Sequence, residues 1–209
     1  MKISYQLKQV RERIQKGLVD KGLLSTSKTN FLLFDMATHP TTPLGITLKA
    51  SIITRINALL FAKSISIPQA ALQEEGTQCR VLRSVALCIA SYAASVLENA
   101  LGQAQGRAGP AVLGFEEKEE AFQRCDEILQ AFTVVPFLSP TASSSSTSSS
   151  SRRRGNRPAS TSSTEQEAIA ELTKEAMKEI QLEGGDSWEL YAEVVGAVFE
   201  LWGRMDSIL

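Results

Sequence analysis

Residues 30–40, Asn-Phe-Leu-Leu-Phe-Asp-Met-Ala-Thr-His-Pro, constrain the fold of this chain more than any other stretch. Its four consecutive apolar residues would place apolar groups on both faces of a strand, because successive side chains of a strand alternate in direction. We interpret the stretch as strand and turn, paired with a segment ahead of it in which the short polar residues of 24–29 form a turn. Such a hairpin needs two apolar neighbours: its own domain, and a second subunit or a membrane surface. A strand buried on both faces inside one domain fits the pattern equally well.

Most of the remaining chain has the apolar periodicity of helices. We predict helices over residues 44–63, 78–101 and 115–132, a fourth from residue 164 to about 182, and a last one that begins after Asp186 or Ser187. The last helix carries a broad apolar stripe that we expect to face the core: Trp188, Tyr191, Val194, Val195, Val198, Leu201 and Trp202. The predicted fold is mainly α, a single helical-core domain formed by residues 1–137 and 165–209, with a protruding apolar β-hairpin.

Residues 138–164 interrupt this pattern with serine and threonine runs around an arginine triplet at 152–154. A segment this polar cannot bury enough apolar surface to offset the entropy that it would lose on ordering. We therefore predict a disordered insertion in a surface loop. A solvated spacer explains the arginine triplet more simply than a phosphorylation or nuclear-import signal does.

The spacing of apolar and basic residues over 4–22 predicts a basic amphipathic helix. Its apolar stripe, which we expect to face the core, consists of Ile3, Leu7, Val10, Ile14 and Leu18. Lys8 and Arg11 stand three residues apart, so on a helix both cations can converge on one anion. A solvated basic face is the commoner explanation of such a pair.

Composition excludes several classes of protein. The 22 basic and 23 acidic residues of the 209-residue chain nearly cancel, so no overall field attracts it to nucleic acid. The three cysteines, Cys79, Cys88 and Cys125, form no CxxC pair and favour a reducing compartment. We find neither a signal peptide nor an uninterrupted run of about 20 apolar residues, and expect any membrane contact to be peripheral.

The motifs of common enzyme classes are missing from the sequence. There is no nucleophile with an adjacent base, no metal cluster and no glycine-rich loop with the lysine that a phosphate site needs. The single histidine, His39, precedes Pro40 in a predicted turn. We expect no catalysis, no bound metal and no cofactor.

Several motifs of the chain resemble the Golgi phosphoprotein 3 family. They are residues 5–13 (YQLKQVRER), 17–22 (GLVDKG), the stretch 30–40, 80–87 (RVLRSVAL), 96–99 (VLEN), 194–198 (VVGAV) and 204–207 (RMDS). The resemblance spans nearly the whole chain but only about the C-terminal two-thirds of the family's domain. The family's basic N-terminal tail and first helices have no counterpart in the sequence.

This resemblance implies a lipid site and a membrane anchor. In the family, basic residues at the positions of Lys8 and Arg11 bind the headgroup of phosphatidylinositol 4-phosphate, together with an aromatic residue and an arginine from the part without a counterpart here. The hairpin residues Phe31, Leu32, Leu33 and Phe34 are implied to mediate oligomerisation and membrane insertion, with Phe31 and Leu32 as the inserting pair.

The resemblance further implies a peripheral adaptor on the cytosolic face of the Golgi membrane. Such an adaptor binds the cytosolic tails of glycosyltransferases and retains these enzymes in the Golgi through coatomer-dependent retrograde transport. Two alternatives stay open. One is a truncated structural subunit that oligomerises through the hairpin without binding lipid itself, and the other is a fragment of a longer reading frame.

Overall fold

The computed structural model describes residues 8–31, 34–62, 64–103, 113–133 and 163–205. By its internal contacts the chain divides into two compact units, unit 1 with Met1–Ile52 and unit 2 with Ile53–Leu209. The boundary falls inside helix α2, Pro43–Leu60. The architecture is mainly α with one small hairpin, as predicted. The single domain over residues 1–137 and 165–209 stays a prediction.

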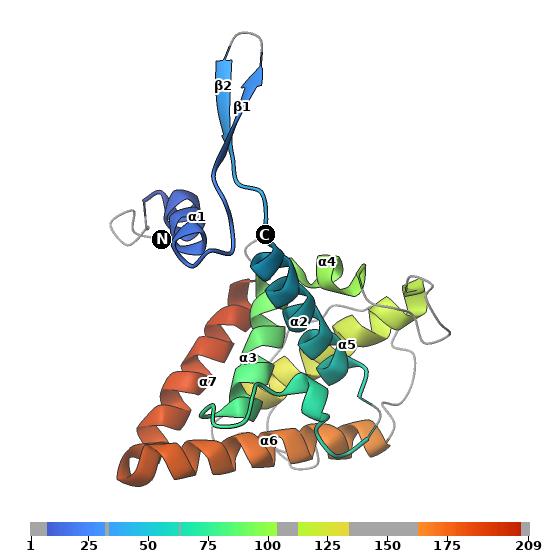
Figure 1. Ribbon diagram of the computed structural model, residues 1–209. Helices are drawn as coiled ribbons and strands as arrows, with labels where there is room; N and C mark the ends of the chain where they lie inside the picture. Colours follow the sequence, from blue (N-terminus) through green and yellow to red (C-terminus); the bar gives the residue numbers. More distant parts are fainter. Residues whose placement is uncertain (1–7, 32–33, 63, 104–112, 134–162, 206–209) are drawn as a thin grey trace. The chain divides into compact units, whose positions relative to one another are not determined.

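Unit 1 contains helix α1, Val10–Asp20, and an antiparallel hairpin of β1, Ser27–Phe31, and β2, Phe34–Thr38 (Figure 1). The register pairs Ser27 with Thr38 at the open end and Phe31 with Phe34 at the closed end. The hairpin is therefore confirmed, but the predicted turn over residues 24–29 is wrong, because the last three of those residues belong to β1. Two residues, Leu32 and Leu33, separate the strands and lie outside the described residues.

Helix α1 is shorter and more exposed than predicted. It begins at Val10, after a turn formed by Lys8 and Gln9, and residues 1–7 lie outside the described part. None of its residues is buried, and Val10 and Ile14 are 42% and 58% exposed. The expectation that this stripe faces the core is therefore wrong for these two residues. Periodicity identifies the apolar side of a helix but not the element that covers it.

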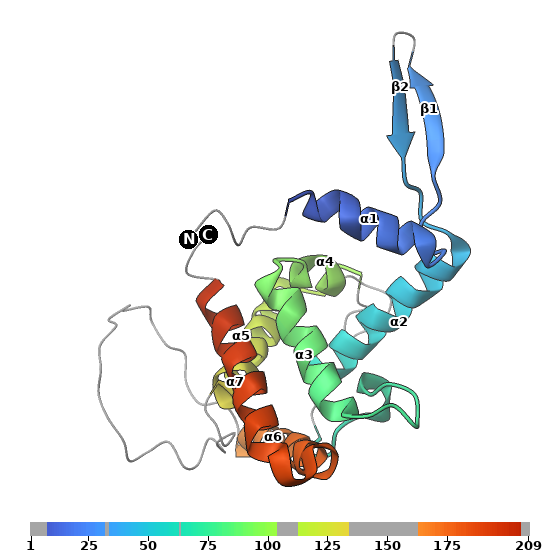
Figure 2. The ribbon, with the colours of Figure 1, turned by 90° about the vertical axis from the view of Figure 1, so that its left-hand side faces the viewer.

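Unit 2 is a set of packed helices. Its elements are the C-terminal part of α2, η2 (Gln69–Ala71), α3 (Arg80–Ala93), α4 (Leu97–Leu101), α5 (Phe115–Phe132), α6 (Ser163–Gly184), η4 (Gly185–Ser187) and α7 (Trp188–Met205). Helix α3 packs against α5, α6 and α7, and α6 meets α7 at η4 (Figure 2). Helix α5 has the predicted bounds. Helix α6 begins at Ser163, so the last two residues of the predicted insertion are helical, and residues 138–162 lie outside the described part.

The core of unit 2 is apolar and aromatic. Fully buried side chains come from α3 (Val85, Ile89), from α5 (Ile128, Phe132) and from α7 (Phe199). The rings of Phe132 and Phe199 meet edge to face, with centroids 5.5 Å apart. Such pairs contribute about 0.5 to 1.5 kcal/mol beyond the area that they bury, and this pair joins α5 to α7.

The single helix predicted over residues 78–101 is wrong, because the chain forms α3 and α4 there. Ser95 adopts the left-handed conformation at φ 56°. The amide of Val96 donates to the carbonyl of Ser91 and the amide of Ser95 to that of Tyr92, both at 2.9 Å. This is a Schellman ending, which normally uses glycine at the left-handed position, so the sequence gives no clear stop signal.

The start of α3 is held by a residue far along the chain. The carboxylate of Glu179, on α6, accepts hydrogen bonds from the backbone amides of Val81 and Leu82 at 2.9 to 3.1 Å. The first amides of a helix have no partner within it, and a carboxylate there is favoured by the helix dipole. Glu179 thus ties α6 to the start of α3.

The apolar stripe predicted for the last helix divides between core and solvent. In α7 the buried residues are Ala192, Gly196 and Phe199, and Trp188, Val195 and Trp202 are half-buried. The other four members of the predicted stripe, Tyr191, Val194, Val198 and Leu201, are exposed. The prediction that they face the core is therefore wrong.

Candidate functional site

The candidate site is built on the junction that joins α1, the hairpin and α2 within unit 1 (Figure 1). Helix α1 ends in a Schellman motif: the amide of Leu23 donates to the carbonyl of Leu18 at 2.9 Å and that of Gly22 to Val19 at 2.8 Å. Gly22 takes φ 70°, which glycine adopts at little cost. The chain therefore reverses sharply after the helix and enters the hairpin.

The two arms of the hairpin are fastened together below the strands. The amide of Ser25 donates to the carbonyl of Pro40 at 2.9 Å, and the amide of Thr42 donates to the carbonyl of Leu23 at 3.1 Å. At the open end of the sheet, the hydroxyls of Ser27 and Thr38 lie 2.7 Å apart. These bonds extend the pairing from the strands down to the helices.

Thr42 and Gly45 complete the junction. The hydroxyl of Thr42 donates to the carbonyl of Gly22 at 2.7 Å and accepts from the amide of Gly45 at 3.1 Å, so it caps the start of α2. A Cβ added to Gly45 would lie 2.2 Å from the carbonyl oxygen of Leu23. Only glycine allows this close approach, and the junction consequently holds α1, the hairpin and the start of α2 as one piece.

Lys8 and Arg11, the predicted lipid-headgroup residues, are both exposed. Because α1 starts at Val10, Lys8 precedes the helix, and the three-residue helical spacing invoked for the pair does not apply to it. Gln9 sits between them in the left-handed conformation, and its side chain makes no capping hydrogen bond. The two cations thus flank the amino end of α1, where backbone amides point outward.

The predicted insertion residues lie at the far end of the hairpin from this junction. Phe31 and Phe34 end the two strands and face each other in the register, directly beside the two-residue connection. Leu32 and Leu33, which form that connection, lie outside the described residues. The four predicted residues therefore cluster in the chain at the closed end of the hairpin rather than along one strand.

Charge is distributed unevenly between the two units. Residues 1–52 carry eight basic and three acidic side chains, a net charge of +5, whereas residues 53–209 carry 14 and 20, a net charge of −6. The near-zero charge of the whole chain hides this asymmetry. Unit 1 can attract anions that the chain as a whole would not.

Two cysteines of unit 2, Cys79 and Cys88, have a raised thiol pKa. The side-chain hydrogen bond to Cys125, followed by burial, raises the pKa of Cys88 well above its usual value. These two sulfurs lie 3.8 Å apart in the core, where they pack as small apolar groups. Within the described ranges no group of three or more His, Cys, Asp or Glu residues could hold a metal ion. No helix of the described part is long and apolar enough to cross a membrane.

Comparison with known proteins identifies the family. The family model described as Golgi phosphoprotein 3 (GPP34) matches residues 2–180. The chain belongs to the Golgi phosphoprotein 3 family. It is 42% identical over its full length to vacuolar protein sorting-associated protein 74 of Schizosaccharomyces pombe and 32% identical to the protein of that name from Eremothecium gossypii. These matches cover 52% and 53% of the relatives, so the chain spans about half the length of the curated relatives that it matches.

Sequence reasoning missed the hydrogen-bonded junction between α1, the hairpin and α2. Gly45 could have indicated the junction, because glycine destabilises the interior of a helix and its presence there suggests that another part of the chain approaches closely. Thr42 before Pro43 was another indication, since threonine is a common cap and proline a common first residue of a helix.

Proposed function

We propose that this chain is a peripheral membrane adaptor of the Golgi, which binds phosphatidylinositol 4-phosphate beside α1 and contacts the bilayer with its hairpin. Membership of the Golgi phosphoprotein 3 family and the sorting role named for the relatives support a Golgi trafficking function. One observation carries the proposal: in unit 1, the exposed cations Lys8 and Arg11 and the apolar end of the hairpin belong to one hydrogen-bonded piece.

The amino end of α1 suits an anionic headgroup. Its outward-pointing amides and the positive end of the helix dipole attract phosphate. Lys8 and Arg11 add two charge-assisted contacts, each of about 1.5 to 3 kcal/mol. A phosphomonoester on the inositol ring carries more negative charge than the diester of an ordinary phospholipid. It is therefore attracted more strongly both by the amino end of α1 and by the two cations.

The hairpin would add apolar contact at the same surface. Burying one side chain such as Phe31 in the bilayer contributes about 1.5 to 3 kcal/mol. Stable membrane attachment generally needs two such signals together. The headgroup contact selects the membrane, and Phe31, Leu32, Leu33 and Phe34 lengthen the residence there.

Family membership also leads us to propose the partners. These are the cytosolic tails of glycosyltransferases, the coatomer coat and further copies of the chain. The two-stranded sheet supports self-association, because its outer edges have no strand partner among the described residues and can pair with another chain. Retention requires the adaptor to hold a tail and the membrane at the same time.

Liposome flotation tests the lipid contact. We expect the chain to prefer vesicles with phosphatidylinositol 4-phosphate over vesicles with the 3-phosphate isomer, which carries the same charge. Lys8→Ala with Arg11→Ala should abolish this preference. Arg13→Ala with Lys16→Ala removes the same charge from exposed positions of α1 and should retain it. A preference that survives the first double variant contradicts the assignment of these two residues.

The rival function, an oligomerising subunit that binds no lipid, predicts a different pattern. Light scattering after size exclusion would then show a stable oligomer that depends on the hairpin, while flotation would show no preference among phosphoinositides. An oligomer together with 4-phosphate selectivity supports the adaptor.

A further inference from the structure

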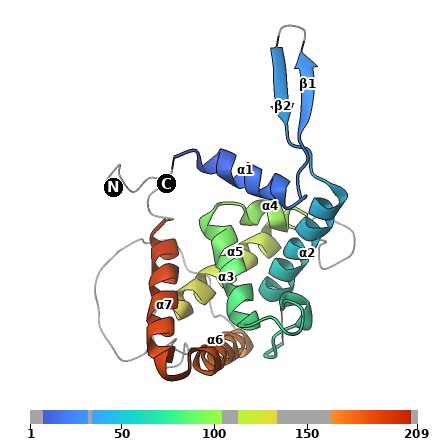
Figure 3. The same cartoon turned by 60° about the vertical axis from the view of Figure 1, so that its left-hand side comes forward.

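Two of the three cysteines of the chain lie in contact in the core of unit 2. The sulfur atoms of Cys88 and Cys125 are 3.8 Å apart, and neither residue has any exposed surface. Cys88 belongs to α3 and Cys125 to α5, two helices that pack against each other (Figure 3). Both thiols are free. The contact therefore brings together two thiols that are 37 positions apart in the sequence and not covalently joined.

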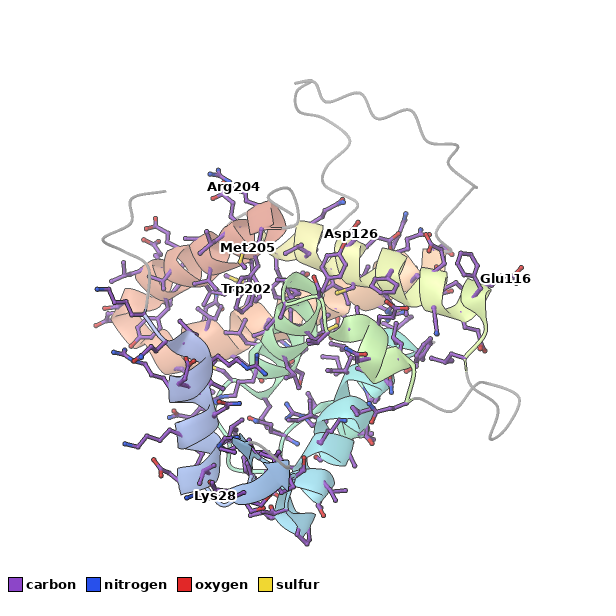
Figure 4. All side chains as sticks on the ribbon, turned by 90° about the horizontal axis from the view of Figure 1, so that it is seen from above. Lys28, Glu116, Asp126, Trp202, Arg204 and Met205 are labelled. Carbon is purple, nitrogen blue, oxygen red and sulfur yellow. The ribbon has the colours of Figure 1, made fainter. Side chains whose placement is uncertain are left out.

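The surrounding packing keeps the two thiols close to each other. Ile89, next to Cys88, and Ile128, almost one turn after Cys125, are fully buried as well. By contrast Asp126, the next residue of α5, is exposed and points outward (Figure 4). In a close-packed core few side-chain rotamers are open, and the two sulfur atoms consequently stay within reach of each other.

The third cysteine is too distant to compete for either thiol. Cys79 directly precedes α3, nine residues before Cys88, and nine residues of helix extend about 13 Å. A disulfide needs sulfur atoms about 2 Å apart. Because Cys125 is in contact with Cys88, Cys79 lies out of reach of both. Oxidation of the folded chain can therefore join only one pair of cysteines within it.

We propose that Cys88 and Cys125 form a reversible disulfide, which links α3 covalently to α5 when the chain is exposed to hydrogen peroxide. Peroxide oxidises one thiolate to a sulfenic acid and releases hydroxide, and the second thiol then forms the S–S bond and releases the oxygen as water. In sum the two thiols give up two electrons and two protons, and the peroxide becomes two molecules of water. A dithiol reductant reverses the step by exchange.

Burial makes this disulfide slow to form. The hydrogen bond to Cys125, followed by burial, raises the pKa of Cys88, so little of the reactive thiolate is present in the folded core. Oxidation therefore depends on local openings that admit a molecule as small as peroxide. We expect the pair to respond to sustained oxidation and not to a brief exposure.

Once formed, the disulfide should stabilise unit 2. It closes a loop of 37 residues and so removes conformations from the unfolded chain. Helix α3 also packs against α6 and α7, so the link joins α5 to the helix that contacts most of the unit. Both cysteines belong to unit 2, and the inference does not depend on the membrane function proposed above.

The test uses the full chain with Cys79→Ser, in which only the two buried thiols remain. After prolonged incubation of the folded chain with hydrogen peroxide, the chain is unfolded, alkylated and digested. We expect the peptides that contain Cys88 and Cys125 to be joined, with both cysteines protected from alkylation. The thermal midpoint of the oxidised chain should rise by about 5 °C or more and return to its original value with dithiothreitol.

A matched variant separates the disulfide from general oxidation. Cys125→Ala in the same background leaves Cys88 without a partner, so peroxide should not raise its thermal midpoint. Peptide mapping of the chain with all three cysteines should show the same joined pair, and this measurement stands even if Cys125→Ala folds poorly. Two intact thiols after oxidation, a sulfinic acid at either position, or a joined pair that lowers the thermal midpoint would overturn the proposal.

Discussion

At Gly45 the difference between a hydrogen atom and a methyl group decides whether the junction of unit 1 can close. The Cβ of an alanine would lie 2.2 Å from the carbonyl oxygen of Leu23 and 2.8 Å from a methyl carbon of Thr41. Because the nearest atom is backbone, no side-chain rotation can relieve the contact. The position therefore couples the start of α2 to the chain that leads into the hairpin.

We expect Gly45→Ala to weaken the junction by about 1 to 3 kcal/mol, the usual cost of overpacking a tight site. Amide hydrogen exchange should show it first at Thr42, whose amide bonds to Leu23 across the junction. Gly17→Ala is the matched control, because a Cβ at this helical glycine meets nothing within 4 Å. That change should stabilise α1 by up to about 1 kcal/mol. Unchanged exchange at Thr42 in Gly45→Ala would show that the junction adapts freely.

Cys79 offers a pH-dependent readout of the contact between α3 and α6. Partial burial, followed by the carboxylates of Glu179 and Glu183, raises the pKa of this thiol. The thiolate is the reactive form, so alkylation by iodoacetamide should need a higher pH than alkylation of a free cysteine. Cys88 and Cys125 are buried and should stay unmodified in the folded chain.

Removing one neighbouring negative charge should reverse part of that shift. Glu183→Gln is expected to lower the pKa of Cys79, so the pH profile of alkylation moves toward lower pH. Glu175→Gln on the same helix removes a carboxylate that pairs with Lys178 and should leave the profile in place. A profile that does not move in Glu183→Gln would mean that burial and the carboxylate of Glu179 raise the pKa without a contribution from Glu183.

At the scale of single elements, the sequence predicted the types of elements better than their ends and neighbours. The hairpin followed from the apolar run of residues 31–34, but its register did not, because Leu32 and Leu33 are not the glycine or asparagine that two-residue hairpin loops prefer. Polar residues 24–29 look more like a turn and are partly strand. In the same way, serine at the left-handed position hid the break between α3 and α4.

The exposed faces of α1 and α7 mark a second limit of prediction from sequence. Both stripes were assigned to the core from their 3.6-residue period, yet Ile14 and Leu201 are exposed. A periodic pattern records that a face is apolar, whether it packs inside the chain or against a partner. The spacing of Lys8 and Arg11 singled out the pair, but its assignment to a lipid headgroup came only from the family resemblance, since two basic residues near a helix start are common on protein surfaces.

The hairpin can be tested as an element by changing its closed end. Phe31→Ser with Phe34→Ser should lower the fraction of chain that floats with phosphatidylinositol 4-phosphate vesicles about tenfold or more, because each lost apolar contact is of the order of 1.5 to 3 kcal/mol. Leu44→Ser with Leu48→Ser removes two exposed apolar side chains elsewhere in unit 1 and serves as the control. Equal losses in the two double variants would point to general apolar adhesion rather than to the hairpin.

At the scale of the whole molecule, the two units carry opposite net charges, +5 on residues 1–52 and −6 on residues 53–209. Basic residues near an anionic surface contribute about 1 kcal/mol each at low salt, and the contribution decays within a Debye length. That length falls from about 10 Å at 0.1 M salt to about 3 Å at 1 M. A chain of net charge −1 should therefore bind phosphatidylserine vesicles in low salt and release them as salt rises.

The origin of that attraction can be assigned by neutralising equal numbers of cations in different places. Changing Arg13, Lys16 and Lys21 of unit 1 to glutamine should reduce low-salt binding to phosphatidylserine vesicles by about tenfold or more. Changing Arg152, Arg153 and Arg154 to glutamine alters the net charge of the chain identically but leaves unit 1 intact, and should change binding little. If the two triple variants lose affinity equally, net charge governs the attraction and the basic character of unit 1 is incidental. If only the first loses it, unit 1 is the part of the chain that meets the membrane.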